Sequence, residues 1–189
     1  SKILLNPERK RVESMDKFIK DSAHELNTPI TVLMTSVSML KNGKNPEKMM
    51  KYILSSSKQI SQIYNDIHFS AFNEINEDVY EEFDLKDLVA ESVDYFNDIS
   101  ITKNIQINSN LLNCFIKMDK TKTQKLVNNL ISNAIKYSYK DSIIKVTLED
   151  NILSIKDFGM GIIQEEQKEI FKRYKRGNNN EGGFGIGLD

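Results

Sequence analysis

Apolar residues recur at spacings of four and three in the first part of the chain, at Leu26, Ile30, Leu33, Val37 and Leu40. This heptad repeat predicts one long amphipathic helix from about Val12 to Lys41. The pattern then breaks, because Gly43 is a suitable helix C-cap and Pro46 suits the first turn of a following helix.

A second helix is predicted from Pro46 to about Phe72, with Ile53, Ile60 and Ile67 one heptad apart. Two long helices joined by a short turn form an antiparallel hairpin. A lone hairpin buries only one stripe on each helix, so the simplest way to bury more is a dimer. We therefore expect two hairpins to pair in a four-helix bundle.

The periodicity changes after the second helix. Residues 73–82 are polar and acidic, which predicts a linker. In residues 83–189 helical stretches alternate with short strands, which indicates an α+β second domain whose sheet leans antiparallel. Helices are predicted at 83–96, 120–137 and 164–174, with Asp84 and Asp119 as N-caps of the first two. Strands are predicted at 104–109, 114–118, 143–149 and 152–157, with a hairpin turn at Asp150 and Asn151.

The composition excludes some classes of function. The chain has 189 residues, 39% of them hydrophobic, and a formal net charge of −1, which suits one or two globular domains. The balanced charge argues against nucleic-acid binding, which a basic excess would indicate. Cys114 is the single cysteine, so no disulfide forms within the chain, and a reducing compartment fits. No apolar run approaches the roughly 20 residues of a membrane span, so membrane contact is expected only through segments outside this chain.

His24 lies inside the first predicted helix, in the stretch FIKDSAHELNTPITVL. Thr28 shares its face one turn on, and Glu25 flanks it. Pro29 cannot donate a hydrogen bond to the carbonyl of Glu25, so the helix is expected to bend here. Neutral imidazole is a nucleophile near pH 7, and an adjacent carboxylate can orient it or accept its proton. The alternative is a surface histidine on a kinked helix.

The helix predicted at 120–137 carries a polar face at Asn129, Asn133 and Tyr137. Asparagine is mildly unfavourable inside a helix, so two of them one turn apart suggest a function. Amide oxygens are suitable ligands for Mg²⁺, which keeps several waters and binds phosphates. The alternative is a solvated polar face.

A carboxylate and two glycines follow the last predicted strand. Asp157 has the strand parity of Leu153 and Ile155, so it is expected to end a row of inward side chains. Gly159 and Gly161 permit a tight turn and a close backbone approach. A buried carboxylate needs a partner, and the exocyclic amine of a base would serve. The alternative is an ordinary Asp-Gly turn.

The C-terminal stretch combines cationic side chains with glycines. Gly183, Gly185 and Gly187 present backbone N–H groups that suit a phosphate. The basic run 172–176, which ends with Arg176, can meet a triphosphate, although such a run is also common on a solvated face.

Five stretches, in this order, closely resemble the H, N, G1, F and G2 boxes of sensor histidine kinases: HELNTP, NNLISNAIKYS, DFGMGI, IFKRYKRG and GGFGIGL. The resemblance covers nearly the whole chain. It implies a dimerisation and phosphoacceptor hairpin (1–72), a linker (73–82) and an ATP-binding α/β sandwich with a mixed sheet (83–189). It also implies autophosphorylation with ATP and Mg²⁺, followed by phosphotransfer to an aspartate of a response-regulator receiver domain.

In the hairpin, the resemblance implies three roles. His24 matches the phosphoacceptor, and Glu25 matches the acid that assists proton removal. Thr28 matches the residue that helps to orient water in a phosphatase reaction.

In the second domain, Asn133 matches the Mg²⁺ ligand and Asn129 its companion. Lys136 matches a phosphate contact, and Tyr137 a residue beside the nucleotide. Asp157 matches the carboxylate that recognises the adenine amino group.

The remaining matches lie in the basic and glycine-rich boxes. Arg176 matches a basic residue that reaches the γ-phosphate, and the glycines match the mobile lid. Relatives continue past the position of Asp189, so we expect this chain to be the cytoplasmic portion of a longer inner- or plasma-membrane sensor protein.

Two other functions stay open. One is a related ATPase without phosphotransfer, a class that typically has a glutamate base where this chain has Asn129. The other is a degenerate kinase that acts as a dimerisation and signalling scaffold, against which the intact His24, Asn133 and Asp157 argue.

Overall fold

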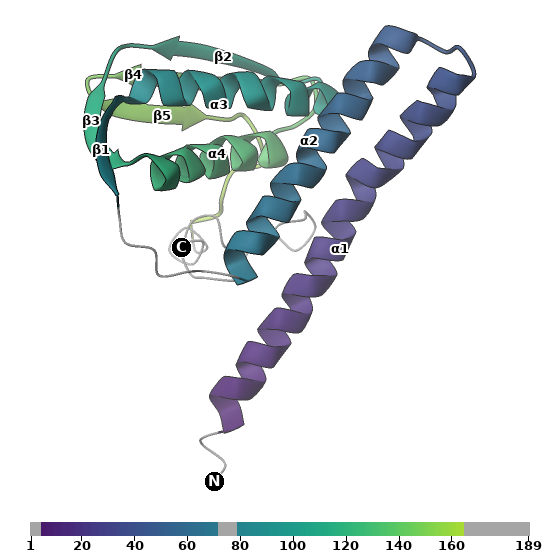
Figure 1. Cartoon of the computed structure of the whole chain (residues 1–189), viewed down its shortest axis with the longest axis horizontal. Helices are drawn as coiled ribbons and strands as arrows, with labels where there is room; N and C mark the ends of the chain where they lie inside the picture. Colours follow the sequence, from purple (N-terminus) through teal and green to yellow (C-terminus); the bar gives the residue numbers. More distant parts are fainter. Residues whose placement is uncertain (1–4, 72–78, 165–189) are drawn as a thin grey trace.

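The computed structural model describes residues 5–71 and 79–164. Two long helices, α1 (Leu5–Lys41) and α2 (Pro46–Ala71), pack side by side as an antiparallel hairpin (Figure 1). Their connection is a Schellman motif, in which Gly43 N–H donates to the Leu40 carbonyl and Lys44 N–H to the Met39 carbonyl, both at 3.0 Å. Gly43 has a φ of +67°, which glycine adopts without strain, so the predicted C-cap is confirmed.

The hairpin leaves large apolar side chains exposed to solvent. Seven of them are between 40% and 66% exposed: Val12, Ile19, Ile30, Met34, Met50, Leu54 and Tyr64. Two amphipathic helices alone cannot cover all of their apolar surface, and exposed apolar patches often mark association sites. This surface is therefore available for a second hairpin. Within the described ranges, no helix is long and apolar enough to cross a membrane.

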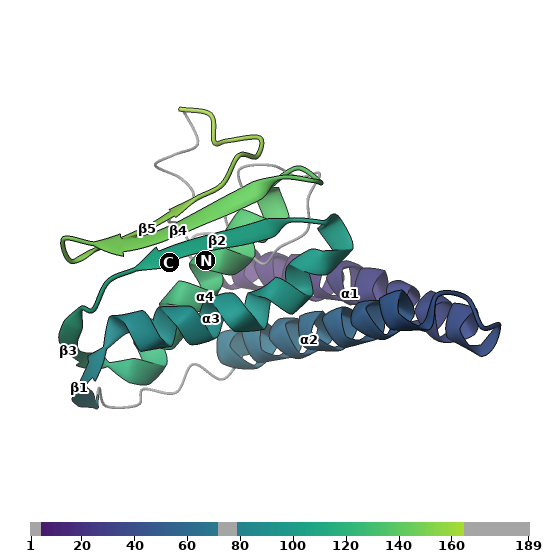
Figure 2. The same cartoon turned by 90° about the horizontal axis from the view of Figure 1, so that it is seen from above.

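The second domain contains two sheets. Its elements are β1 (Tyr80–Asp84), α3 (Leu85–Ser100), the 3₁₀ helix η1 (Ile101–Lys103), β2 (Gln106–Leu111), β3 (Phe115–Asp119), α4 (Lys120–Tyr137), β4 (Ile143–Glu149) and β5 (Ile152–Lys156). β1 and β3 form an antiparallel pair, and the larger sheet has the order β2-β4-β5. Helices α3 and α4 cover one face of the larger sheet and lie between it and the hairpin (Figure 2). This arrangement is the predicted helix-on-sheet sandwich.

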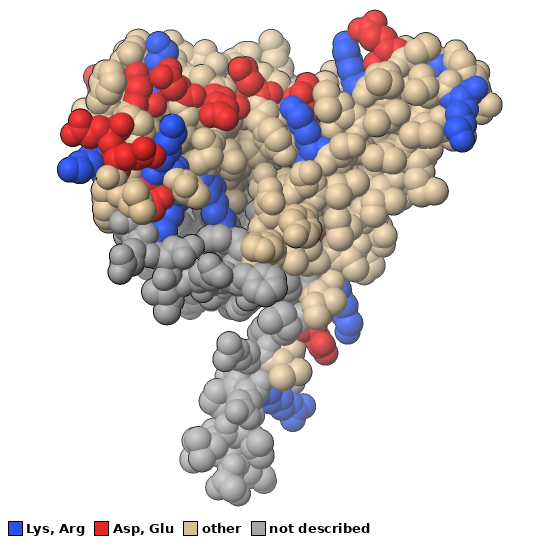
Figure 3. Space-filling view, in the orientation of Figure 1, with Lys and Arg blue, Asp and Glu red and all other residues tan. Residues whose placement is uncertain are grey.

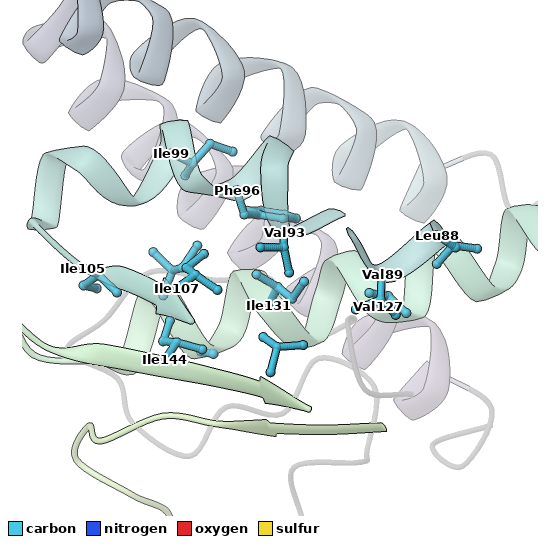
Figure 4. Packing of buried hydrophobic residues seen from close by; sticks show 13 residues of the cluster. Leu88, Val89, Val93, Phe96, Ile99, Ile105, Ile107, Val127, Ile131 and Ile144 are labelled. Atoms are coloured by element: carbon cyan, nitrogen blue, oxygen red, sulfur yellow. The ribbon is translucent and has the colours of Figure 1, made fainter. Parts of the chain in front are cut away.

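The core of this domain lies between the two helices and the larger sheet. Side chains from α3, α4, β2 and β4 point toward one another there (Figure 4). Strand β4 contributes Ile144, Val146 and Leu148, each at most 1% exposed, because alternate residues of a strand share one face. Phe96 of α3 and Ile131 of α4 are also at most 1% exposed. Helix α4 is thereby fixed on its apolar side, and Asn129 and Asn133 are not part of this core cluster.

The predicted caps and hairpin turn are confirmed, whereas the predicted end of the linker needs correction. Asp119 accepts a hydrogen bond from Lys122 N–H at the start of α4, and Asp150 and Asn151 both have positive φ, as their turn requires. The larger sheet is mixed, as the resemblance implies, because β2 and β4 pair in parallel whereas β4 and β5 pair antiparallel. Strand β1 begins at Tyr80, inside the segment expected to be a linker, because pairing with β3 outweighs its acidic composition. The helix predicted at 164–174 lies outside the described residues, except for Gln164.

Asp84, the last residue of β1, connects the start of α3 to the residues that precede β3 through hydrogen bonds of its side chain. Its carboxylate accepts hydrogen bonds from Lys86 N–H at 3.0 Å, from Cys114 N–H at 2.8 Å and from the Asn113 amide at 2.8 Å. These hydrogen bonds lower the pKa of Asp84 below its ordinary value, and the bond from Cys114 N–H has the largest effect.

The lowered pKa of Asp84 predicts a pH-dependent contribution to stability. A carboxylate with a lowered folded-state pKa stabilises the fold fully above its unfolded pKa of about 4, and this contribution is lost as the pH falls through the folded pKa. We expect Asp84→Asn to be less stable than the wild type at pH 7. The difference between the two should shrink below about pH 4 in urea unfolding curves measured against pH. A difference that is constant with pH would contradict this prediction.

Candidate functional site

The HELNTP stretch lies in α1, which continues through Pro29 as one helix from Leu5 to Lys41. His24 is exposed, and among the described residues no side chain hydrogen-bonds its imidazole. Pro29 is buried and provides no N–H for the Glu25 carbonyl, while the Thr31 hydroxyl donates to the Asn27 carbonyl at 2.8 Å. The bend expected at Pro29 stays a prediction. The imidazole is thus presented to solvent beside a carboxylate.

Glu25 joins this stretch to the end of α4. The Lys136 ammonium donates to the Glu25 carboxylate at 2.7 Å, across 111 positions of sequence. The two side chains are only 24% and 15% exposed, so water screens their attraction less than it would on an open surface. The pair therefore places the end of α4 next to the residue that follows His24.

A double-mutant cycle with Glu25→Gln and Lys136→Met is expected to give a coupling of about 1 kcal/mol in the free energy of unfolding. The exposed pair Glu47–Lys51 is the matched control, because it has a similar distance of 2.9 Å but side chains 83% and 57% exposed. Its coupling should be smaller and should fall more steeply with added salt. Equal couplings for the two pairs would show that burial does not strengthen the Glu25–Lys136 contact.

A second contact region holds the two domains in this position. On α2, the Ser55 hydroxyl donates to the Ile99 carbonyl at 3.2 Å, and the Gln59 amide reaches the Thr102 hydroxyl at 3.3 Å. Lys58 pairs with Asp98 at 2.6 Å. Acidic side chains gather on the solvent face of the second domain in Figure 3, and α3 contributes Asp87, Glu91, Asp94 and Asp98. Lys58 of α2 thus pairs with the last of these four acidic residues, and this attraction favours the packing of α2 against α3.

The asparagine face of α4 is half-buried. Asn129 and Asn133 lie one turn apart, and Tyr137 follows on the same face. Among the described residues, no side chain hydrogen-bonds the Asn133 amide. No group of three or more His, Cys, Asp or Glu side chains in the described ranges could hold a metal ion. The side-chain oxygen of an asparagine is a ligand that Mg²⁺ accepts together with phosphate oxygens.

The segment after β5 closes on the last turn of α4. Met160 N–H donates to the Tyr137 carbonyl at 3.4 Å, and Ser138 forms a β-bridge with Gly159. A Cβ atom on Gly159 would lie 1.9 Å from the Tyr137 carbonyl oxygen, so only glycine permits this approach. Gly159 N–H also donates to the half-buried Asp157 carboxylate at 2.9 Å. The end of α4 thus contacts both Glu25, through Lys136, and the segment that carries Asp157.

Comparisons with known proteins agree with this arrangement. The His Kinase A (phospho-acceptor) domain model matches residues 14–74. The model of histidine kinase-, DNA gyrase B- and HSP90-like ATPases matches residues 118–189. Glu25 lies in the region that the first model matches and Lys136 in the region that the second matches, so their ion pair joins the two regions. The chain belongs to the sensor histidine kinases.

This histidine kinase is similar to curated relatives throughout its length. It is 26% identical to the sensor histidine kinase RppB of Synechocystis sp., an alignment that covers 98% of this chain and 45% of RppB. It is 27% identical to the sensor histidine kinase YkoH of Bacillus subtilis, over 95% of this chain and 42% of YkoH. The chain therefore spans less than half the length of these relatives.

Solved structures show the same fold. The Acinetobacter baumannii histidine kinase AdeS matches with a TM-score of 0.51 and 26% identity, over 87% of this chain and 83% of that one. The histidine kinase ThkA, solved in complex with the response regulator protein TrrA, matches with a TM-score of 0.54 and 24% identity. That match covers 89% of this chain and 53% of ThkA. It is evidence for the fold only.

The structure brings together some of the residues that the motifs predicted. Glu25 contacts Lys136, and the last turn of α4 contacts the segment that carries Asp157, Gly159 and Gly161. Gly161 has a φ of +69°, a backbone conformation that glycine adopts without strain.

Other predicted site residues are not part of the contacts at the end of α4. Thr28 is exposed on α1, and no hydrogen bond of its side chain to another described residue is present. Arg176, Gly183, Gly185 and Gly187 lie outside the described residues. Sequence reasoning missed Lys103, which reaches the end of α4 from η1. No local pattern reveals it, because its partners lie 32 to 35 positions further along the chain.

Proposed function

We propose that this histidine kinase phosphorylates itself on His24 with ATP and then passes the phosphoryl group to an aspartate of a response regulator. The observation that carries the proposal is the Glu25–Lys136 ion pair. It joins the phosphoacceptor stretch to the helix that bears the nucleotide motif, although 111 positions separate the two residues. A nucleotide whose phosphates lie at the end of α4 would be close to His24.

The chemistry follows from the residues at this junction. A nitrogen of neutral His24 attacks the γ-phosphorus of ATP, an N–P bond forms, and the bond to the β-phosphate oxygen breaks to release ADP. The imidazole loses a proton, which Glu25 would accept. Phosphoryl transfer depends mainly on positioning and on neutralising charge. Lys136 would supply that charge by exchanging its partner, Glu25, for the phosphates, which frees the carboxylate to act as a base.

The residues around the end of α4 would hold the nucleotide. The Asn133 amide, with Asn129 one turn earlier, fits a Mg²⁺ ion that is bound largely through phosphates. When bound, such an ion would neutralise phosphate charge. Asp157 would accept a hydrogen bond from the adenine amino group, with Tyr137 beside the nucleotide. Arg176 and the glycines at 183, 185 and 187 would complete the site from the C-terminal stretch.

The partners follow from the same proposal. The exposed apolar side chains of α1 and α2 support a homodimer formed through the hairpin. ThkA was solved with a response regulator, which supports a receiver domain as the second partner, with Thr28 taking part in a phosphatase reaction. We place the chain in the cytoplasmic portion of a longer membrane sensor, and this location stays a prediction.

The test is incubation of the chain with γ-labelled ATP and Mg²⁺. A label that survives alkali and is lost in acid is expected, because phosphohistidine has a phosphoramidate bond. Purified receiver domains should remove it. A chain that binds nucleotide and hydrolyses it without labelling would favour the ATPase alternative, and a chain that binds no nucleotide would favour the scaffold.

A further inference from the structure

Lys103 ends the 3₁₀ helix η1, and its ammonium reaches the C-terminal end of α4. It donates to the carbonyls of Ile135 at 3.1 Å, Lys136 at 2.5 Å and Ser138 at 3.4 Å. The side chain is half-buried. One ammonium thus meets three backbone carbonyls of the turn that bears Lys136 and Tyr137.

The carbonyls at the end of α4 show what this contact does. The last four carbonyls of a helix have no partner within the helix unless a cap supplies one. The Ala134 carbonyl accepts from Ser138 N–H at 3.1 Å, and the Tyr137 carbonyl accepts from Met160 N–H at 3.4 Å. Lys103 provides donors for the two carbonyls between them, those of Ile135 and Lys136. A cation at this position also interacts favourably with the negative end of the helix dipole.

The backbone that carries Lys103 is itself fixed on both sides. The Lys103 carbonyl accepts from Asp141 N–H at 3.1 Å, and the Asn104 amide donates to the Asp141 carboxylate at 2.7 Å. From the hairpin, the Gln59 amide of α2 donates to the Thr102 hydroxyl. Lys103 is therefore held between the docked hairpin and the loop after α4, at a defined distance from the last turn of α4.

We propose that Lys103 is a positioning residue for the nucleotide site. Its ammonium keeps the last turn of α4 helical, so that Lys136 and Tyr137 point where the phosphates and base of ATP bind. Without it, the two helix carbonyls of Ile135 and Lys136 lose this donor, the last turn frays, and the backbone that carries the Lys136 side chain is no longer fixed. The expected effect of Lys103 on nucleotide affinity rests on the proposed function. Its expected effect on the position of Lys136 is independent of that function.

Lys103→Met tests the proposal, because it removes the ammonium and keeps the apolar stem. We expect the dissociation constant of a fluorescent ATP analogue to rise about tenfold, since a misplaced Lys136 and Tyr137 each weaken binding. Lys103→Arg should restore most of the affinity, because a guanidinium also donates to carbonyls. Lys140→Met is the control, because it makes the same charge change on an exposed side chain four positions after Lys136. It should bind as the wild type does.

A second measurement does not depend on nucleotide. The Glu25–Lys136 coupling, determined by the same double-mutant cycle, should fall at least by half in a Lys103→Met background and persist with Lys103→Arg. Hydrogen exchange of peptides that cover residues 134–142 should also become faster with Lys103→Met alone. If Lys103→Met fails to fold, Lys103→Gln, which keeps a shorter N–H donor, takes its place in every measurement.

The outcomes separate the two proposals. If the wild type binds no nucleotide, the proposed function fails, and the coupling and exchange data still decide whether Lys103 positions Lys136. If Lys103→Met lowers only the melting temperature, with affinity, coupling and exchange unchanged, its role is merely structural and the positioning proposal is overturned.

Discussion

Replacement of His24 with glutamine is expected to abolish labelling from γ-labelled ATP, a reduction of at least a thousandfold that reaches the detection limit. The amide of glutamine is not nucleophilic, so no N–P bond can form at this position. His24 is exposed and among the described residues makes no side-chain hydrogen bond, so its removal should leave thermal stability and nucleotide affinity close to those of the wild type. Liquid scintillation counting and an ATP-analogue titration on the same preparations measure both effects.

His68→Gln is the matched control, because His68 is the other histidine of the chain and is also exposed on a hairpin helix. Its ring lies near the Tyr64 ring, with 6.1 Å between centroids. It is far along α2, and no carboxylate follows it in the sequence. We expect normal labelling. Label that persists in His24→Gln and disappears in His68→Gln would move the phosphoacceptor to α2 and remove the functional reason for the Glu25–Lys136 contact.

Local patterns in the sequence predicted those parts of the fold that local interactions determine. The heptad repeat predicted α1 and α2, although α1 begins at Leu5 and not at Val12, and the glycine of the connecting turn has the positive φ expected of a C-cap. Asp84 and Asp119 cap their helices through hydrogen bonds to backbone groups two and three positions away. Such features depend on residues within one turn, so a single sequence reveals them.

The features that the sequence did not reveal depend on distant partners. Strand β1 has the acidic sequence YEEFD, which resembles a linker, and only its pairing with β3 makes it a strand. The Glu25–Lys136 pair and the carbonyl contacts of Lys103 join residues 111 and 32 to 35 positions apart. The motifs identified Glu25 and Lys136 separately, but only the docking of α3 on α2 brings them together. The arrangement of the site is therefore a property of the domain interface.

Gly159→Ala is expected to cause the second large loss, where the segment after β5 contacts the end of α4. The added Cβ would lie 1.9 Å from the Tyr137 carbonyl oxygen and 2.6 Å from its carbonyl carbon, distances at which backbone must move. Overpacking of this kind costs about 1–3 kcal/mol in stability. The segment that carries Asp157 must shift away from α4, so we expect nucleotide affinity to fall at least tenfold, as titration with an ATP analogue would measure.

Gly43→Ala separates this steric effect from the cost of losing a glycine. Gly43 has a φ of +67° and no atom within 4 Å of an added Cβ, so the substitution causes backbone strain of about 1–2 kcal/mol without a clash. Its place in the hairpin turn keeps it away from the end of α4, so nucleotide affinity should stay at the wild-type value. If Gly159→Ala also binds nucleotide normally, Asp157 does not depend on its contact with α4. The close approach of the two segments would then have a purely structural role, and the adenine contact proposed for Asp157 would have to be sought elsewhere.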